Sequence, residues 1–112
     1  MIFNLREKCH DSPKKEFFYG AKINREIKDV YLGLCFLEPG EVNRKVGPGK
    51  GHEELLYLMT GQIRVNTKDK EINLNEGEVF FIPDGLKVFL KNLTEERSYF
   101  MIAGGHTKHH KH

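Results

Sequence analysis

Two side chains that can do chemistry lie two residues apart in the middle of the sequence, His52 and Glu54. If this segment forms a strand, alternation places both on one face together with Leu56 and Leu58. An imidazole and a carboxylate on one face can hold a polar ligand or supply two ligands to a divalent metal. Three interpretations of His52 stay open: a polar pair with Glu54 at a pocket or its rim, half of a metal site, or a solvated loop residue.

Lys50 lies just before this pair, in the glycine-rich segment 47–51. Its ammonium group can pair with Glu54, bind an anionic ligand, act as an amine nucleophile or base if burial lowers its pKa, or point into water. The segment lacks the G-x4-G-K-[ST] pattern of a phosphate-binding loop and leads into a predicted strand. It therefore does not indicate a phosphate cradle.

The elements that must position these residues are short strands. Apolar or alternating runs are separated by turn signals such as Glu38-Pro39-Gly40 and Pro83-Asp84-Gly85. The predicted strands include 30–37, 55–59, 63–66, 72–74, 79–82, 88–90 and 99–103. Short strands with turn signals about 8–12 residues apart predict an all-β sandwich or barrel.

Length and composition limit the class of protein. A chain of 112 residues forms one domain. Basic and acidic side chains nearly balance, 18 against 16, and no basic cluster favours nucleic-acid binding. The longest uncharged apolar run, 30–37, is too short to cross a membrane, and the chain opens without the pattern of a secretory signal. Cys9 and Cys35 form no metal-binding spacing. We therefore expect a cytoplasmic protein with no nucleic-acid or membrane partner.

Two spaced patterns carry a resemblance to a known family. In the first, six residues separate Glu54 from Gly61. In the second, Gly77 is followed at fixed spacing by four positions, Pro83, Gly85, Val88 and Asn92. Together they resemble the cupin signatures G-x5-H-x-H-x3,4-E-x6-G and G-x5-P-x-G-x2-H-x3-N. The resemblance is to small single-domain cupins and covers about residues 30–103. It implies a jelly-roll β-barrel, commonly dimeric, with a ligand site inside the barrel.

The positions of the family's metal ligands do not match. The two histidine positions of the first motif fall on Pro48 and Lys50, or on Gly47 and Gly49 at the longer spacing, and the third falls on Val88. Glu54 is retained. Proline and valine side chains cannot coordinate a metal, and a protonated lysine repels a cation. We therefore predict no cofactor at the family's usual site, and keep His52 and Glu54 as candidate ligands of a displaced divalent metal.

The function predicted from the resemblance is a metal-free cupin that binds a small polar or anionic metabolite in its barrel. The candidate ligand-binding residues are Lys50, His52, Glu54, Val88 and Leu90. One alternative is a cupin enzyme, an isomerase, an epimerase or a dioxygenase-like protein, that acts through His52 and Glu54 with or without a displaced metal. In such an epimerase Tyr57 or Tyr99 would be the acid. Another alternative is a structural or regulatory protein whose barrel is filled by side chains.

The organisation that we predict has three parts: an N-terminal arm with edge strands over residues 1–28, a cupin barrel over 29–103, and a disordered histidine-rich tail over 104–112. Residues 17–19, Phe-Phe-Tyr, form an apolar patch that a lone barrel would expose. Exposed apolar patches usually mark interfaces, and two-fold pairing is the commonest arrangement. We therefore expect a homodimer.

Overall fold

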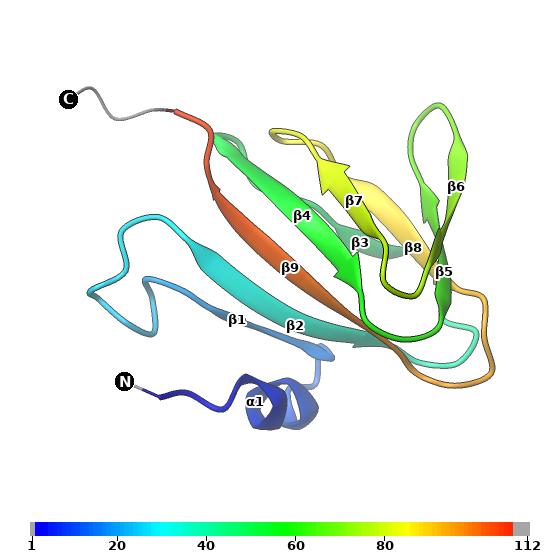
Figure 1. The fold of residues 1–112 in the computed structure, drawn as a ribbon, viewed down its shortest axis with the longest axis horizontal. Coiled ribbons are helices and arrows are strands. Elements are labelled where there is room, and N and C mark those ends of the chain that lie inside the picture. The colour runs from blue at the N-terminus through cyan, green and yellow to red at the C-terminus, as the bar shows by residue number, and fades with distance from the viewer. Residues whose placement is uncertain (1, 109–112) are drawn as a thin grey trace.

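A computed structural model shows the fold of residues 2–108 (Figure 1). One short helix precedes nine strands. In chain order these are α1 (Leu5–Asp11), β1 (Glu16–Tyr19), β2 (Tyr31–Leu37), β3 (Arg44–Val46), β4 (His52–Leu58), β5 (Gln62–Asn66), β6 (Glu71–Asn75), β7 (Val79–Ile82), β8 (Val88–Asn92) and β9 (Ser98–His106). The all-β fold class predicted from the turn spacing is confirmed.

The strands form two antiparallel sheets. The larger sheet has five strands in the order β1-β2-β9-β4-β7, and the smaller has four in the order β3-β8-β5-β6. Sequence neighbours such as β2 and β3 lie in different sheets, which is the jelly-roll pattern of exchange between layers. Among the described residues the strands pair within each sheet and leave the sandwich open.

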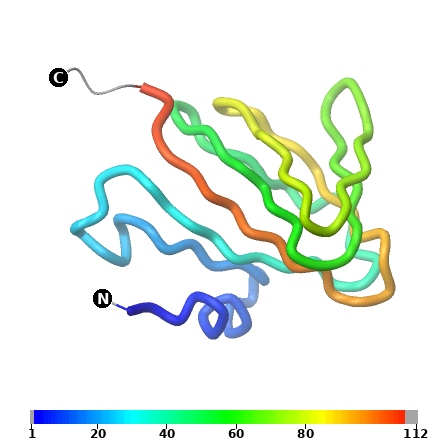
Figure 2. Tube along the Cα trace, viewed as in Figure 1, coloured from blue at the N-terminus to red at the C-terminus, as the bar shows by residue number. Residues whose placement is uncertain are grey.

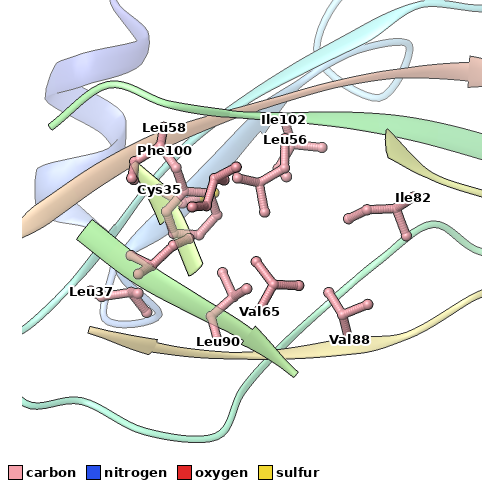
Figure 3. Close-up of a cluster of buried hydrophobic side chains, with 12 residues drawn as sticks. Cys35, Leu37, Leu56, Leu58, Val65, Ile82, Val88, Leu90, Phe100 and Ile102 are labelled. Atoms are coloured by element: carbon pink, nitrogen blue, oxygen red, sulfur yellow. The ribbon is translucent and has the colours of Figure 1, made fainter. Parts of the chain in front are cut away.

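The space between the sheets is filled by apolar side chains (Figure 3). Alternation supplies them: in β4 the buried positions are every second residue from Glu54 to Leu58, and in β8 Val88 and Leu90 are fully buried. The cluster comprises Cys35, Leu37, Leu56, Leu58, Ile63, Val65, Leu74, Ile82, Val88, Leu90, Phe100 and Ile102. A core of this size is the main source of stability in a domain of this length.

The helix α1 covers part of the outer face of the larger sheet (Figure 1). Asn4 caps it by accepting a hydrogen bond from the Glu7 amide at 3.1 Å, and Cys9 is fully buried against Leu34 and Phe36. The sequence prediction missed this helix because about two turns carry too little apolar periodicity to be distinguished from a loop. No helix in the described part of the chain is long and apolar enough to span a membrane.

Motif residues hold the turns between the strands. Gly61 has φ +86°, and a methyl group there would overlap the Ser98 side chain, so glycine alone fits. The Asn92 amide is buried and donates to the backbone carbonyls of Glu38 at 3.0 Å and Glu96 at 2.7 Å. Its oxygen accepts from the Ser98 hydroxyl at 2.9 Å. Asn92 therefore joins two chain-distant loops at one end of the sandwich.

The boundaries drawn from the sequence need correction at the C-terminal end. Strand β9 continues to His106, so residues 104–106 are strand rather than disordered tail. They are ordered because β4 and β2 pair with β9 on its two sides, with Gly104 opposite both Tyr31 and Glu54. Thr107 extends the ordered segment, since its amide donates to the Gly51 carbonyl at 2.9 Å. Residues 109–112 of the predicted tail lie outside the described residues.

Candidate functional site

A pocket of about 520 Å³ opens at one end of the larger sheet, on the face that points into the sandwich. We call it the inner pocket. The loop between β1 and β2 forms one wall, and the beginning of β4 and the end of β9 form the other; Figure 2 shows these segments at the same end of the molecule. Its lining residues are Phe18, Gly20, Ala21, Lys22, Lys28, Asp29, Val30, Tyr31, His52, Glu54 and His106.

Three adjacent strands build the floor of this pocket. Tyr31 of β2 and Glu54 of β4 both pair with Gly104 of β9, which lies between them. The Tyr31 ring lies over Gly104, where a methyl group would overlap it, and its hydroxyl donates a 2.6 Å hydrogen bond to Glu54 Oε2. Because glycine has no side chain, the phenol can cross the middle strand. The Glu54 carboxylate therefore has a charge-assisted hydrogen bond, the stronger kind.

Two histidines stand next to each other one row further out. His52 pairs with His106 across β4 and β9, and their ring centres are 4.3 Å apart. His106 Nδ1 makes a short contact with the Asp29 carboxylate, which also accepts the His106 amide at 2.6 Å. His52 Nδ1 lies 3.3 Å from the Lys50 carbonyl oxygen. Both imidazoles are thus oriented through Nδ1 by an oxygen acceptor, which leaves Nε2 of each for a ligand.

Burial sets the protonation states at the floor. Desolvation raises the pKa of Tyr31 well above its ordinary value, and the hydrogen bond to Glu54 adds to that effect. The phenol therefore stays protonated and keeps donating. Desolvation also raises the pKa of Glu54 above 4.5, while the Tyr31 hydrogen bond and the nearby Lys87 and His52 oppose the shift. The floor of the pocket thus holds a carboxylate whose charge is supported mainly by a neutral phenol.

The structure brings together some of the sequence-predicted residues and separates others. His52 and Glu54 line the inner pocket and share a face with Leu56 and Leu58, as alternation predicted. Lys50 does not pair with Glu54: it lies exposed in the turn before β4, and Tyr31 is the partner of the carboxylate. Of the alternatives kept open for Lys50, the structure shows the one in which the side chain points into water, because Lys50 lies in the turn before β4 begins at His52.

Val88 and Leu90 lie in the core rather than at the pocket surface. Neither side chain has any exposed area, and both belong to the apolar cluster between the sheets. Their assignment as ligand-binding residues needs correction, because the space that the resemblance assigned to a ligand is filled here by the apolar side chains of both sheets (Figure 3).

The four family ligand positions do not fit a metal in this structure. Pro48 is buried, Lys50 is exposed, Val88 lies in the core, and Glu54 is bound to Tyr31. Within residues 2–108 no group of three histidine, cysteine, aspartate or glutamate side chains is arranged to hold a metal ion.

Sequence reasoning missed Tyr31, Asp29 and His106 as members of the site. Tyr31 was counted in an apolar strand, and His106 was assigned to the tail. The available signal for His106 was the alternation of β9, in which Phe100, Ile102, Gly104 and His106 share a face. Tyr57 and Tyr99, the acids considered for an epimerase, lie on the outer face, so Tyr31 is the tyrosine of this pocket.

Comparison with known proteins supports the fold. No protein-family model and no curated protein matches the chain. Solved structures do match. The cupin domain of Cnp3 from Schizosaccharomyces pombe matches with a TM-score of 0.62 and 17% identity, over 70% of this chain and 56% of that chain. A variant of oxalate decarboxylase from Bacillus subtilis matches with a TM-score of 0.70 and 17% identity, over 85% of this chain and 26% of that chain. The cupin domain of CENP-C from Drosophila melanogaster also matches, with a TM-score of 0.54 and 23% identity, over 63% of this chain and 57% of that chain.

The chain therefore has the cupin fold. It spans little more than half of the length of the Cnp3 and CENP-C cupin chains and about a quarter of the decarboxylase chain. The Bacillus subtilis decarboxylase carries Mn(II) centres. At identities below 25% these likenesses define the fold, and the chemistry of this chain has to be argued from its own residues.

Proposed function

We propose that this chain is a cytoplasmic cupin-fold protein that binds a small polar or anionic metabolite in the inner pocket without a metal. The observation that carries the proposal is the convergence of Tyr31, His52, Glu54 and His106 on one pocket of about 520 Å³. That volume falls within the usual range of small-molecule sites, roughly 300–1,000 Å³.

The polar groups of the pocket suit a ligand that both donates and accepts hydrogen bonds. Glu54 accepts, and each histidine offers Nε2 as an acceptor when neutral or as a donor when protonated. Lys22 and Lys28 lie exposed at the rim and attract negative charge. A hydroxylated carboxylate or a phosphate monoester would place its anionic group toward the lysines and its hydroxyl groups toward Glu54 and His52.

The filled interior supports a ligand at the mouth of the sandwich rather than in its centre. Beyond Glu54, the next inward residues of β4 are Leu56 and Leu58, which have no exposed area. A ligand in the inner pocket would therefore contact the row of Tyr31 and Glu54 and the row of His52 and His106, and not Val88 or Leu90.

Titration tests this proposal. We would titrate small hydroxy acids and phosphate monoesters into the full chain and into a chain ending at Lys108, by thermal shift and calorimetry. Shortening the chain separates binding in the pocket from binding at the histidines of residues 109–112. His52→Gln should weaken binding about tenfold, the cost of a lost hydrogen bond to a charged group. Lys45→Gln, on the outer face of the smaller sheet, should leave it unchanged. Equal binding by wild type and His52→Gln would contradict the proposal.

A second candidate function, proton transfer, is favoured by the Asp29–His106 pair. A histidine oriented by a carboxylate beside a protonated tyrosine supplies a base and an acid in one pocket. This arrangement replaces the His52, Glu54 and Tyr57 or Tyr99 set expected from the sequence. The test is whether the α-proton of a bound hydroxy acid exchanges with deuterium in D₂O. Exchange that is lost in Tyr31→Phe and in His106→Gln would support an isomerase or epimerase. A ligand that binds without exchange would show that the pocket binds and does not catalyse proton transfer.

We also propose that the chain forms a homodimer through the outer face of β4 and β7. Leu55 pairs with Phe81 and Tyr57 pairs with Val79, and all four side chains are at least 41% exposed. The patch expected from residues 17–19 does not form: Phe17 and Tyr19 lie beside Phe3, while Phe18 points to the opposite face, over Gly33. Strand alternation divides residues 17–19 between the two faces of the sheet. On β4 and β7 the exposed apolar residues pair across the strands, so they form one contiguous face.

A further inference from the structure

A second pocket, of about 290 Å³, lies on the opposite face of the larger sheet, beside α1. We call it the outer pocket. Its lining residues are Arg6, His10, Leu34, Met59, Thr60 and Tyr99. None of them lines the inner pocket, because Leu34, Met59 and Tyr99 belong to the cluster beneath the helix rather than to the core between the sheets.

The helix holds two nitrogen-bearing side chains over this pocket. Arg6 and His10 are four residues apart in α1 and therefore lie on one face of the helix. Burial of Cys9 against the sheet fixes the orientation of the helix, and the Asn4 cap fixes its beginning. The guanidinium group and the imidazole are thus presented from a packed element rather than from a loose arm.

His10 is held in place by aromatic neighbours and one hydrogen bond. Its ring lies edge-on to Phe36 and to Tyr99, with ring centres 5.8 Å apart in both cases. His10 Nε2 is 3.1 Å from the Tyr99 hydroxyl, which is also hydrogen-bonded by Arg97. With the ring neutral, Nε2 either accepts from the Tyr99 hydroxyl or donates to it, depending on the tautomer. In the tautomer that accepts at Nε2, and in the protonated ring, Nδ1 carries a proton and offers a donor.

The floor of the outer pocket combines apolar surface with one more hydroxyl. Leu34 and Met59 supply apolar contacts. Thr60 Oγ1 accepts the Tyr99 amide at 3.0 Å, which leaves the hydroxyl proton of Thr60 for a ligand. The described lining residues therefore present hydrogen-bond donors from Arg6, His10 and Thr60 and include no carboxylate.

We propose that the outer pocket binds a small monocarboxylate with a compact apolar body, such as an aromatic acid, at a site separate from the inner pocket. The carboxylate would accept from the Arg6 guanidinium, which matches it in geometry, and from His10 or Thr60. The apolar body would rest on Leu34 and Met59. The volume of about 290 Å³ lies near the lower end of small-molecule sites and limits the ligand to about the size of a single ring.

Benzoate is the probe that tests this site, titrated into the full isotope-labelled chain and followed by amide and side-chain NMR. We expect saturable shifts at His10, Thr60 and Tyr99 with a dissociation constant of about 1–10 mM, typical of a weak one-ring ligand. Benzamide, with the same ring and no charge, should bind at least about tenfold more weakly, because it cannot form the charge-assisted pair with Arg6.

Variants separate this site from general effects. Arg6→Gln should weaken benzoate binding about tenfold while leaving the fold intact, since Arg6 is exposed. Arg64→Gln, which removes a surface arginine from β5 in the other sheet, and His52→Gln, which alters the inner pocket, should leave it unchanged. The proposal is overturned if benzamide binds as tightly as benzoate, or if benzoate gives no saturable shift. It is also overturned if the shifts are confined to Tyr31 and His52, or if Arg6→Gln binds benzoate as tightly as wild type does.

Discussion

The Tyr31 hydroxyl reaches the Glu54 carboxylate across an intervening strand, at a donor–acceptor distance of 2.6 Å. The two residues are 23 positions apart in the chain and lie on β2 and β4, which are separated by β9. This contact gives the buried carboxylate a partner without a metal or a lysine. It also makes the stability of the domain sensitive to a single phenol, which leads to the first prediction.

Tyr31→Phe should destabilise the domain by roughly 1.5–3 kcal/mol at pH 7, the cost of removing a hydrogen bond to a charged group. Burial raises the pKa of Glu54 above 4.5, so its protonated form is favoured in the folded state, and its contribution to stability is lost as the pH rises through that raised value. The Tyr31 hydrogen bond lowers this pKa. Loss of this hydrogen bond should therefore lower the free energy of unfolding most at pH values above the raised pKa of Glu54, and least below pH 4.5. Urea unfolding at a series of pH values measures this difference.

Gly104→Ala should destabilise the domain by about 1–3 kcal/mol, because a methyl group there overlaps the Tyr31 ring. Tyr31→Ala removes the ring and makes room for the methyl group. In that background Gly104→Ala should cost much less, and thermal unfolding of the four proteins in the cycle measures the coupling. Additive effects of the two substitutions would show that the ring does not lie over Gly104.

Asn92→Ala should destabilise by roughly 2–4 kcal/mol, because the part-buried carbonyls of Glu38 and Glu96 and the buried Ser98 hydroxyl lose their partner. Asn73→Ala is the matched control. That residue is exposed on β6 and accepts one hydrogen bond from Arg64, so its loss should change the free energy of unfolding by less than about 0.5 kcal/mol. Similar effects at the two positions in chemical denaturation would argue against the role given to Asn92.

Phe81→Lys should weaken self-association at least about tenfold if β4 and β7 form the dimer interface, because a charge would enter an apolar contact. Phe89→Lys is the control: it is 41% exposed on the outer face of the smaller sheet and should leave the dimer intact. Sedimentation or light scattering at micromolar concentration measures both. A monomeric wild-type chain would contradict the proposal, as would dissociation by Phe89→Lys alone.

The fold could be predicted from the sequence because the signals that define it are local. Turn residues at Gly61 and Gly85 and alternating apolar runs mark the strands wherever one face is buried. The short helix α1 and the strand β3 were missed, since an element of seven residues or fewer with at most one buried position has no clear period.

The site was only partly predictable, because it depends on cross-strand neighbours rather than on spacing along the chain. His52 and Glu54 are two residues apart, so their common face could be deduced from alternation. The partners Tyr31 and His106 come from strands whose pairing no motif specifies. The sequence left the role of Lys50 open for a related reason: alternation holds only inside a strand, and Lys50 lies in the turn before β4.

The central position of β9 has a consequence for biosynthesis. The last of the described strands, β9, lies between β2 and β4 and joins the β1–β2 hairpin to the β4–β7 pair. During translation both halves leave the ribosome before residues 98–106 and have apolar edges that lack a neighbour. The larger sheet, and with it the Tyr31–Glu54 contact over Gly104, forms only when β9 has emerged and inserted between the halves. Until then β2 and β4 each have an edge of unpaired backbone groups, the feature through which strands pair with other chains.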